Sequence, residues 1–496
     1  MDGMDGSVAG TAFDLGPQER RRLFGQVFDL VEEHARGVRD LPVTPDVTPE
    51  TVRRHLERYD FDGPLEPEGV LADTAAMLRR WTVHTTHPGY FGLFNPNPAA
   101  LGVLGDLLAA AFNPQLAAWS HAPGAVEIER HVTGFLGERL GLPSGRVAGH
   151  FTSGGAEANL TGVLLALTRA FPQVGEDGLA ALPGRPVLYA SAESHLAWLK
   201  IAHMCGLGRR AVRLVPVLPD LRMDLRALTE RIAEDRRAGL LPFLVVGTAG
   251  TTSAGVIDPL GELADLAGAE GLRFHVDAAW AGAAALSDRL RPVLAGIERA
   301  DSVTLDAHKW LAMPMGAGTF LTRDAEGLLE TFRITTAYMP ASTPGAVDPY
   351  AASAQWSRRA IGLKLFVTLA AVGRAGYARM IERQTDLGDL LRRRLADAGW
   401  RVLNRTPLPV VCFTDDAHGG EAGNAARLEA VAERVLRAGH AWISTTAIAG
   451  TPALRACITN LATTEADVET LVTELESARS QEPPPTAAPD RPHYAR

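Results

Sequence analysis

Residues 271–282 read GLRFHVDAAWAG and residues 301–310 read DSVTLDAHKW, and these two stretches decide the fold that the sequence predicts. Each is a short apolar run that ends in polar residues, with Asp277 in the first and Lys309 in the second. Further runs of this kind are RPVLYAS (185–191) and PFLVVGTAG (242–250), with Ala- and Leu-rich helical windows between them. Apolar strands alternating with helices predict an α/β fold with a mostly parallel central sheet covered on both faces. Ligands bind such sheets beyond the carboxyl ends of the strands, where these polar residues stand.

The pattern changes on both sides of this central region. Residues 17–80 show amphipathic helical patterns, whereas a long helical region over 356–398 leads into the short strands WRVLN, LPVVCFT and ALRACITN. Helices mixed with a few strands are typical of a small α+β domain. We therefore expect an N-terminal helical segment (1–90), a large domain (91–345), a smaller C-terminal α+β domain (346–480) and a disordered Pro-rich tail (481–496).

Composition excludes several classes of partner. The formal charge is −9, from 49 Lys and Arg against 58 Asp and Glu, which disfavours nucleic acid or an anionic membrane as a partner. The three cysteines are far apart and form no CxxC, so neither a disulfide framework nor a metal site is expected. We find no signal peptide and no apolar run long enough to span a bilayer, and we expect a cytoplasmic protein.

Lys309 and Asp277 are the first candidate catalytic residues. A lysine directly after an apolar strand, among Ala, Trp, Leu and Met, loses hydration, and this favours a free amine that can form imines. An Asp at the end of an apolar strand needs a cationic partner, and the protonated pyridine nitrogen of pyridoxal 5′-phosphate (PLP) is such a partner. The alternatives are an ordinary lysine that reaches water and a structural Asp paired with an Arg.

Two further motifs belong to the same pattern. Gly154, Gly155 and Ala156 open a helix directly after an extended segment, and exposed N–H groups there form a phosphate site. This is not a P-loop, because no GK[ST] follows. His195 follows the strand ending in YAS and could stack on a cofactor ring or move protons, although a lone histidine is more often structural.

The order of these motifs, each after a strand, resembles the PLP-dependent decarboxylases of the aromatic-amino-acid and glutamate decarboxylase group. These enzymes have the aspartate-aminotransferase-like fold, and the resemblance covers roughly residues 20–475. HVDAAWAG paired with DAHKW is its most specific part. The resemblance implies PLP as cofactor, decarboxylation of an amino acid to the amine, and a homodimer with shared active sites and an N-terminal region that embraces the partner.

Site roles carry over from the resemblance position by position. Lys309 matches the lysine that forms the Schiff base, Asp277 the partner of the pyridine nitrogen, and His195 the ring stacked on the cofactor. The other implied cofactor contacts are Gly154, Gly155, Ala156, Thr248, Ala279, Asp306 and His308.

At the substrate end, the resemblance implies that Tyr338, on a mobile loop, protonates the substrate Cα after CO2 leaves. The implied pocket residues are Phe94, Asn95, Trp119 and Arg358. Gln115 and Ala117 stand where the family often has bulky residues, and Ile361 where aromatic-acid decarboxylases more often carry a charge. These departures weaken the expectation of an aromatic substrate without affecting the cofactor.

Several other functions stay open at this stage. Within the same cofactor class, the enzyme could oxidise its substrate to an aldehyde or eliminate thiol from an S-conjugated cysteine, whereas an aminotransferase suits the Tyr338 loop less well. A nucleotide-dependent oxidoreductase is a remote alternative, because GLGRRA (206–211) fits GxGxxA but precedes a strand instead of following one.

Overall fold

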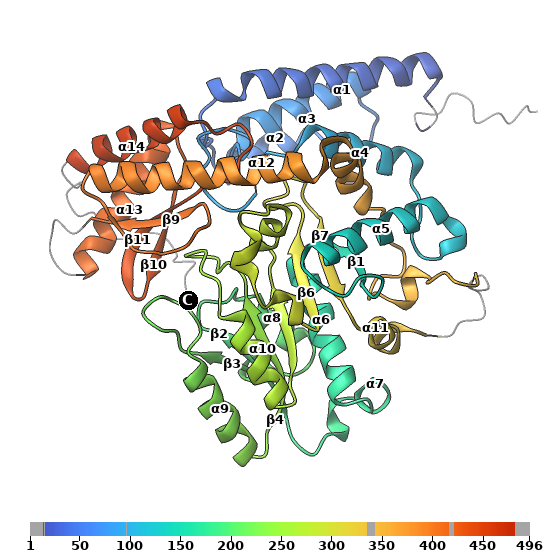
Figure 1. Cartoon of the computed structure of the whole chain (residues 1–496). Helices are drawn as coiled ribbons and strands as arrows, with labels where there is room; N and C mark the ends of the chain where they lie inside the picture. The colour runs from blue at the N-terminus through green and yellow to red at the C-terminus, as the bar shows by residue number, and fades with distance from the viewer. Residues whose placement is uncertain (1–12, 14, 96, 335–342, 416–420, 482–496) are drawn as a thin grey trace, which may run out of the picture.

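The computed structural model describes residues 13, 15–95, 97–334, 343–415 and 421–481 (Figure 1). Its larger sheet has seven strands in the order β1-β7-β6-β5-β4-β2-β3. The strands are β1 (Ala148–Thr152), β2 (Pro186–Ser191), β3 (Val212–Val215), β4 (Leu241–Thr248), β5 (Arg273–Asp277), β6 (Ser302–Asp306) and β7 (Gly318–Thr322). Five neighbouring strands, β3, β2, β4, β5 and β6, run parallel, and β7 is antiparallel to both β6 and β1. The predicted α/β fold with a mostly parallel sheet is confirmed.

Helices cover both faces of this sheet because its strand residues are apolar on both sides. Leu188 and Val246 pack on one face against α6 (Gly155–Ala170) and α8 (Ala197–Met204). Their chain neighbours Val187 and Val245 pack on the opposite face, which carries α9 (Leu225–Arg237) and α10 (Leu260–Ala269). The remaining helices of this part are α5 (Pro123–Arg139), α7 (Val174–Asp177) and α11 (Ala325–Phe332). Almost every residue of β2 and of β4 to β7 is buried. This burial fixes the positions of the strands that end at the site.

A second, antiparallel sheet of four strands follows in the order β10-β11-β9-β8. Its strands are β8 (Arg401–Val402), β9 (Val410–Thr414), β10 (Ser444–Ile448) and β11 (Thr451–Cys457), with α13 (Glu421–Ala438) and α14 (Glu465–Ser480) beside them. The long α12 (Gly362–Asp397) links the two parts and is interrupted at Gly373, whose φ of 65° lies in the region that favours glycine. This part of the chain thus combines a small antiparallel sheet with helices, while the expected division into domains stays a prediction.

The N-terminal helices lie along the top of Figure 1: α1 (Pro17–Gly37), α2 (Pro49–Leu56), α3 (Pro67–Trp81) and α4 (Ala100–Phe112). The connection between α3 and α4 is tied to the second sheet, because Phe91 N donates to Trp442 O and Cys457 N donates to Phe91 O, both at 2.9 Å. This connection therefore reaches the pocket from the side of the smaller unit. Among the described residues, no helix is both long and apolar enough to cross a membrane.

Candidate active site

A pocket of about 260 Å³ opens at the carboxyl edge of the larger sheet. The last residues of three neighbouring strands, Thr248, Asp277 and Asp306, contribute to its wall. Its described lining is Phe94, Gly154, Gly155, Ala156, Asn159, His195, Ala197, Thr248, Gly250, Thr252, Asp277, Ala279, Trp280, Asp306, His308 and Lys309. The structure therefore brings every residue predicted for the cofactor into one pocket.

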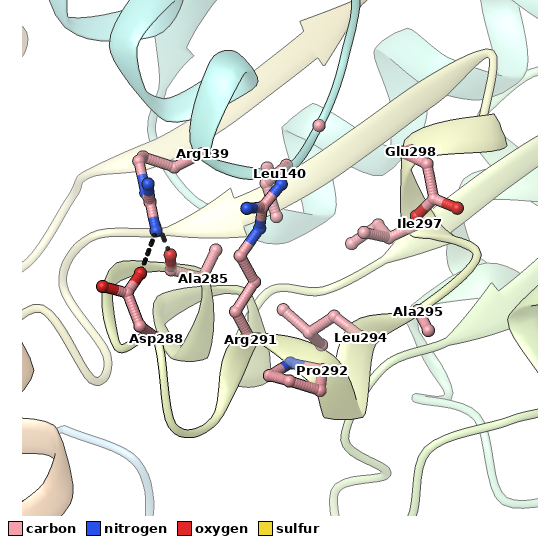
Figure 2. A pocket seen from close by; sticks show the side chains of 11 residues that line it. Arg139, Leu140, Ala285, Asp288, Arg291, Pro292, Leu294, Ala295, Ile297 and Glu298 are labelled. Carbon is pink, nitrogen blue, oxygen red and sulfur yellow. Dashed lines mark hydrogen bonds and ion pairs between the residues drawn. The ribbon is translucent and has the colours of Figure 1, made fainter.

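A larger hollow of about 520 Å³ lies elsewhere, between the end of α5 and the segment from Ala285 to Glu298 (Figure 2). Arg139 there donates to Asp288 Oδ1 at 2.9 Å and to Ala285 O at 3.2 Å, so its charge is already paired. This hollow has neither a lysine nor a histidine in its lining. The pocket at the sheet edge is the one with the chemistry of an active site.

Lys309 has a carboxylate partner inside the pocket. Its Nζ lies 3.0 Å from Asp306 Oδ2, and its side chain is 25% exposed, whereas Asp306 is buried. The apolar neighbours in the sequence are buried beside it, and the strand that delivers the lysine also places Asp306 three residues before it. The ion pair orients the amine toward the pocket. Asp306 Oδ1 is buried and has no hydrogen-bond partner among the described residues.

Asp277 is buried and held by two neutral donors. Its Oδ1 accepts the N–H of Ala279 at 3.1 Å, and its Oδ2 accepts Asn159 Nδ2 at 2.8 Å. No Lys or Arg in the described part of the chain forms an ion pair with it, which disfavours the structural alternative of an Asp–Arg pair. A buried carboxylate bonded only to neutral groups keeps its charge available for a cation in the pocket.

The N-terminus of α6 supplies an anion site. The N–H groups of Glu157 and Ala158 bond back to Gly154 O, whereas those of Gly155 and Ala156 have no partner among the described residues. A Cβ at Gly155 would stand 2.8 Å from an Asp306 carboxylate oxygen, so the close approach of this turn to β6 needs a glycine. Free N–H groups and the positive helix end attract a phosphate.

The two histidines of the pocket are held as neutral acceptors. His195 Nδ1 accepts the N–H of Ala197 at 3.1 Å, and His308 Nδ1 accepts that of Ala317 at 3.2 Å. Burial lowers the pKa of both imidazoles, although Asp277 opposes this effect at His195 and Asp306 opposes it at His308. Each ring therefore presents an uncharged face to the pocket at neutral pH.

Thr248 is fixed from two sides. Its Oγ1 lies 2.7 Å from Ser194 Oγ, and its N–H donates to Asp258 Oδ2 at 2.9 Å. Asp258 also accepts the N–H of Met223 at 2.9 Å. Burial raises the pKa of Asp258 to about 6, against the lowering effect of these two N–H donors. Ser194 and Asp258 were not predicted from the sequence, since a single Ser or Asp carries no signal there for a contact with Thr248.

Phe94, which was predicted for the substrate end, lines the pocket together with Trp280, which was not predicted for the site. The Phe94 and Trp280 ring centroids are 4.4 Å apart, and Trp280 stacks on Trp310 at 5.4 Å. The Arg455 guanidinium lies 4.8 Å from the Phe94 ring centroid and donates to Gly92 O at 2.8 Å. Arg455 is buried although it is an arginine within an otherwise apolar strand, and that contrast was the available signal.

The other residues predicted for the substrate end are not brought together. Asn95, Trp119 and Arg358 are absent from the described lining of the pocket. Trp119 Nε1 donates to Glu127 Oε1 at 2.9 Å, and the buried Arg358 Nη1 lies 2.6 Å from Glu129 Oε1. Tyr338 lies outside the described residues. Arg358 is held away from the pocket because its charge is paired in the core behind β1, where it also donates to Phe151 O at 3.3 Å.

Comparisons with known proteins agree with this geometry. Residues 49–415 match the model of the pyridoxal-dependent decarboxylase conserved domain. The chain is 29% identical to the aromatic-L-amino-acid decarboxylase of Bacillus atrophaeus, over 93% of this chain and 96% of that protein. It is 30% identical to tyrosine/DOPA decarboxylase 2 of Papaver somniferum, over 82% and 78%. The crystal structure of Oryza sativa TDC with PLP and tryptamine superposes with a TM-score of 0.88 at 26% identity, covering 93% of this chain and 98% of that one.

Proposed function

This chain belongs to the pyridoxal-dependent decarboxylase family, and we propose that it converts an aromatic or related L-amino acid to the amine and CO2. It is a carboxy-lyase, and its cofactor is PLP. One observation carries the proposal: a lysine amine, a carboxylate with no cationic partner among the described residues and an open helix N-terminus line the same pocket. The relatives named for aromatic substrates support the proposed substrate class.

The residues of the pocket fit PLP at three points. The free N–H groups of Gly155 and Ala156 would hold its phosphate, and the carboxylate of Asp277 would hold the proton of its pyridine nitrogen. The Lys309 amine would bind it covalently. The small side chain of Ala279 leaves room for one face of the ring, and we assign the other face to His195.

When bound, PLP supplies a sink for the electron pair that the departing CO2 leaves at the substrate Cα. The protein's own part is to keep the site polarised and oriented. Asp277 carries a negative charge that two neutral donors hold in place, so it can keep the pyridine nitrogen protonated. Asp306 orients the Lys309 amine through their ion pair. Because the His195 imidazole is neutral, it adds no positive charge that would compete with the pyridine ring of the cofactor.

We assign the return of a proton to the substrate Cα to Tyr338. The described chain that follows it is anchored to the segment leading into α5: Tyr350 N donates to Ala117 O at 3.0 Å, and Asp348 Oδ1 accepts Trp119 N at 2.8 Å. These contacts hold the described chain from residue 348 onward against the segment that leads into α5.

We further propose that the enzyme works as a homodimer. The α4 and α1 helices each expose an apolar stripe at helical spacing: Val103, Leu104, Leu107, Leu108 and Phe112 on α4, and Phe24, Val27, Phe28 and Val31 on α1. Stripes of this length left in water are typical of protein interfaces. Light scattering should give twice the mass of the chain, and Leu107→Asp should lower it to that of one chain. A monomeric parent protein would contradict the proposal.

Product analysis tests the reaction. The PLP-loaded enzyme is incubated with tyrosine, tryptophan, dopa and a wider amino-acid pool, in air and under nitrogen, and products are resolved by mass. We expect an amine and CO2 in equal amounts, formed equally well without oxygen. Aldehyde that requires oxygen, or a thiol with pyruvate from an S-conjugated cysteine, would overturn the reaction and the role of Tyr338 while leaving the cofactor site intact.

A further inference from the structure

We propose that His275, acting through Asn159, is a positioning residue that fixes the orientation and charge of Asp277. This inference rests on the proposed function, since it assigns to Asp277 the pyridine nitrogen of PLP. His275 is fully buried, two residues before Asp277 on β5, and does not line the pocket. It reaches the site through a continuous row of side-chain hydrogen bonds: Ser302, His275, Asn159 and Asp277.

Asp277 decides which way the Asn159 amide faces. The Asn159 atom that contacts Asp277 Oδ2 at 2.8 Å is Nδ2, a donor. Turning the amide over would place a carbonyl oxygen against the carboxylate, which is repulsive in a buried site. Asn159 Oδ1 must therefore face away from Asp277, and it lies 3.0 Å from His275 Nε2.

The orientation of Asn159 in turn decides the tautomer of His275. Because a carbonyl oxygen only accepts, the proton of the neutral imidazole must be on Nε2. His275 Nδ1 is then an acceptor, and it lies 2.8 Å from the hydroxyl of Ser302, its directly paired residue on β6. Every donor in the row points toward Asp277, so each bond polarises the next in the same sense.

Packing around the imidazole favours this single arrangement. A Cβ at Gly162 of α6 would stand 2.8 Å from His275 Nδ1, so the helix needs a glycine there to admit the ring. The Trp198 ring meets the imidazole edge-on at 5.7 Å between centroids. Burial lowers the pKa of His275 to about 4 although Asp277 opposes this effect, which agrees with a neutral ring. Thr304 Oγ1 also lies near Nε2, at 3.4 Å.

The row explains how Asp277 is held without being neutralised. An Arg or a charged His in contact with the carboxylate would also fix it, but would cancel the charge that the pyridine nitrogen requires. Here the two donors to Asp277 are an amide and a backbone N–H, both uncharged. The neutral row gives orientation and leaves the full negative charge facing the pocket.

Substitutions along the row test the proposal. His275→Phe keeps a ring of similar size and removes both hydrogen bonds, and Asn159→Ala removes the donor to Asp277. We expect each to weaken PLP binding about 10- to 100-fold, measured by fluorescence titration, and to move the pH midpoint of the visible absorbance of the bound cofactor. The double variant should be no worse than the stronger single one, since both break the same row. We expect kcat to fall more than KM changes.

Matched variants separate positioning from folding. His275→Gln can donate to Asn159 and accept from Ser302, so it should recover PLP affinity to within about threefold of the parent. Trp198→Phe changes packing against the same imidazole without touching the row and should leave PLP affinity and the absorbance midpoint unchanged. If His275→Phe does not fold, Ser302→Ala removes the far end of the row and should weaken PLP binding a few-fold.

The outcomes are distinct. The proposal is overturned if PLP affinity and the absorbance midpoint are unchanged in both Asn159→Ala and His275→Phe. If His275→Phe does not fold, Ser302→Ala takes its place in this comparison. Either result would leave His275 a packing residue. A parent protein that does not bind PLP would instead overturn the proposed function itself. A parent that binds PLP and forms a product other than an amine would change the reaction, yet the row would still be tested by affinity and spectrum.

Discussion

The two ends of the pocket are built differently. At the cofactor end, Asp277 and Asp306 each terminate a strand of the larger sheet, Lys309 follows β6 within one turn, and Gly155 begins α6. At the substrate end, Phe94 comes from the connection between α3 and α4, and Arg455, which backs it, comes from the smaller sheet. The first end is positioned by neighbouring strands of one sheet, the second by segments far apart in the chain. A sheet edge tolerates little change in position, whereas connecting segments can vary, so we expect the cofactor end to determine the reaction class and the substrate end the specificity.

The largest effect that we expect at the cofactor end comes from Lys309→Ala. Removing the amine should abolish covalent attachment of PLP and lower kcat by at least about 10⁴-fold, since a covalent step loses its nucleophile. Borohydride reduction followed by peptide mass analysis should label Lys309 in the parent and nothing in the variant. Lys200→Ala is the control, because Lys200 is exposed on α8 and absent from the pocket lining. Equal labelling of Lys200 and Lys309 in the parent would contradict the assignment.

A loss of stability, and not of catalysis, is expected for Arg358→Met. Arg358 and Glu129 form a buried ion pair at 2.6 Å, with side chains 2% and 6% exposed, and removing one partner leaves an unpaired buried charge. We expect a loss of about 3–5 kcal/mol in the free energy of unfolding. Arg358→Met combined with Glu129→Leu should recover much of that loss.

Arg358→Met and its combination with Glu129→Leu also test whether Arg358 contributes to the substrate end of the pocket. If Arg358 acts only in the core, the folded double variant should keep kcat/KM within about threefold of the parent. A large rise in KM in a double variant of parental stability would place Arg358 at the substrate after all.

The difference between the two ends also explains which site residues could be predicted from the sequence. HVDAAWAG and DAHKW predicted Lys309, Asp277 and the sheet edge, because a residue that directly follows an apolar strand can only stand at one edge. Asn159 was missed because it lies inside a helix, one turn past its N-terminus, where nothing in a single sequence marks it as facing β5. Asn95 and Trp119 were assigned by resemblance alone, and their side-chain directions depend on connections whose path the local sequence does not determine.

The pH dependence of stability probes the region behind Asp277. The pKa of His275 is lowered to about 4 from its ordinary 6.5 because the ring is buried, so between these values the unfolded chain binds a proton that the folded chain does not. Stability contributed by the neutral ring is therefore fully present above pH 6.5 and is lost as the pH falls toward 4, by about 3 kcal/mol in total. Urea unfolding of the parent and of His275→Gln should show this as a difference that grows as the pH falls.

A second buried histidine, His150, does not disturb that measurement. It is also buried, and burial lowers its pKa to about 3 with a smaller contribution from Arg358. Its contribution is common to the parent and to His275→Gln, and it cancels in the difference between them. Parallel pH profiles for the two proteins would show that His275 does not titrate as its burial requires.

The smallest effects distinguish two neighbouring residues at the substrate end. Phe94 lines the pocket, packs at a tilt against Trp280 and has the Arg455 guanidinium over its ring, whereas Asn95 is absent from the described lining. Phe94→Leu keeps an apolar side chain and loses both ring contacts, each worth about 0.5–1.5 kcal/mol, so KM should rise about 3- to 10-fold with kcat little changed. Asn95→Ala should change kcat/KM less than about twofold. A larger effect of Asn95→Ala than of Phe94→Leu would mean that the connection between α3 and α4 rearranges when substrate binds. Asn95 would then face the pocket in place of Phe94.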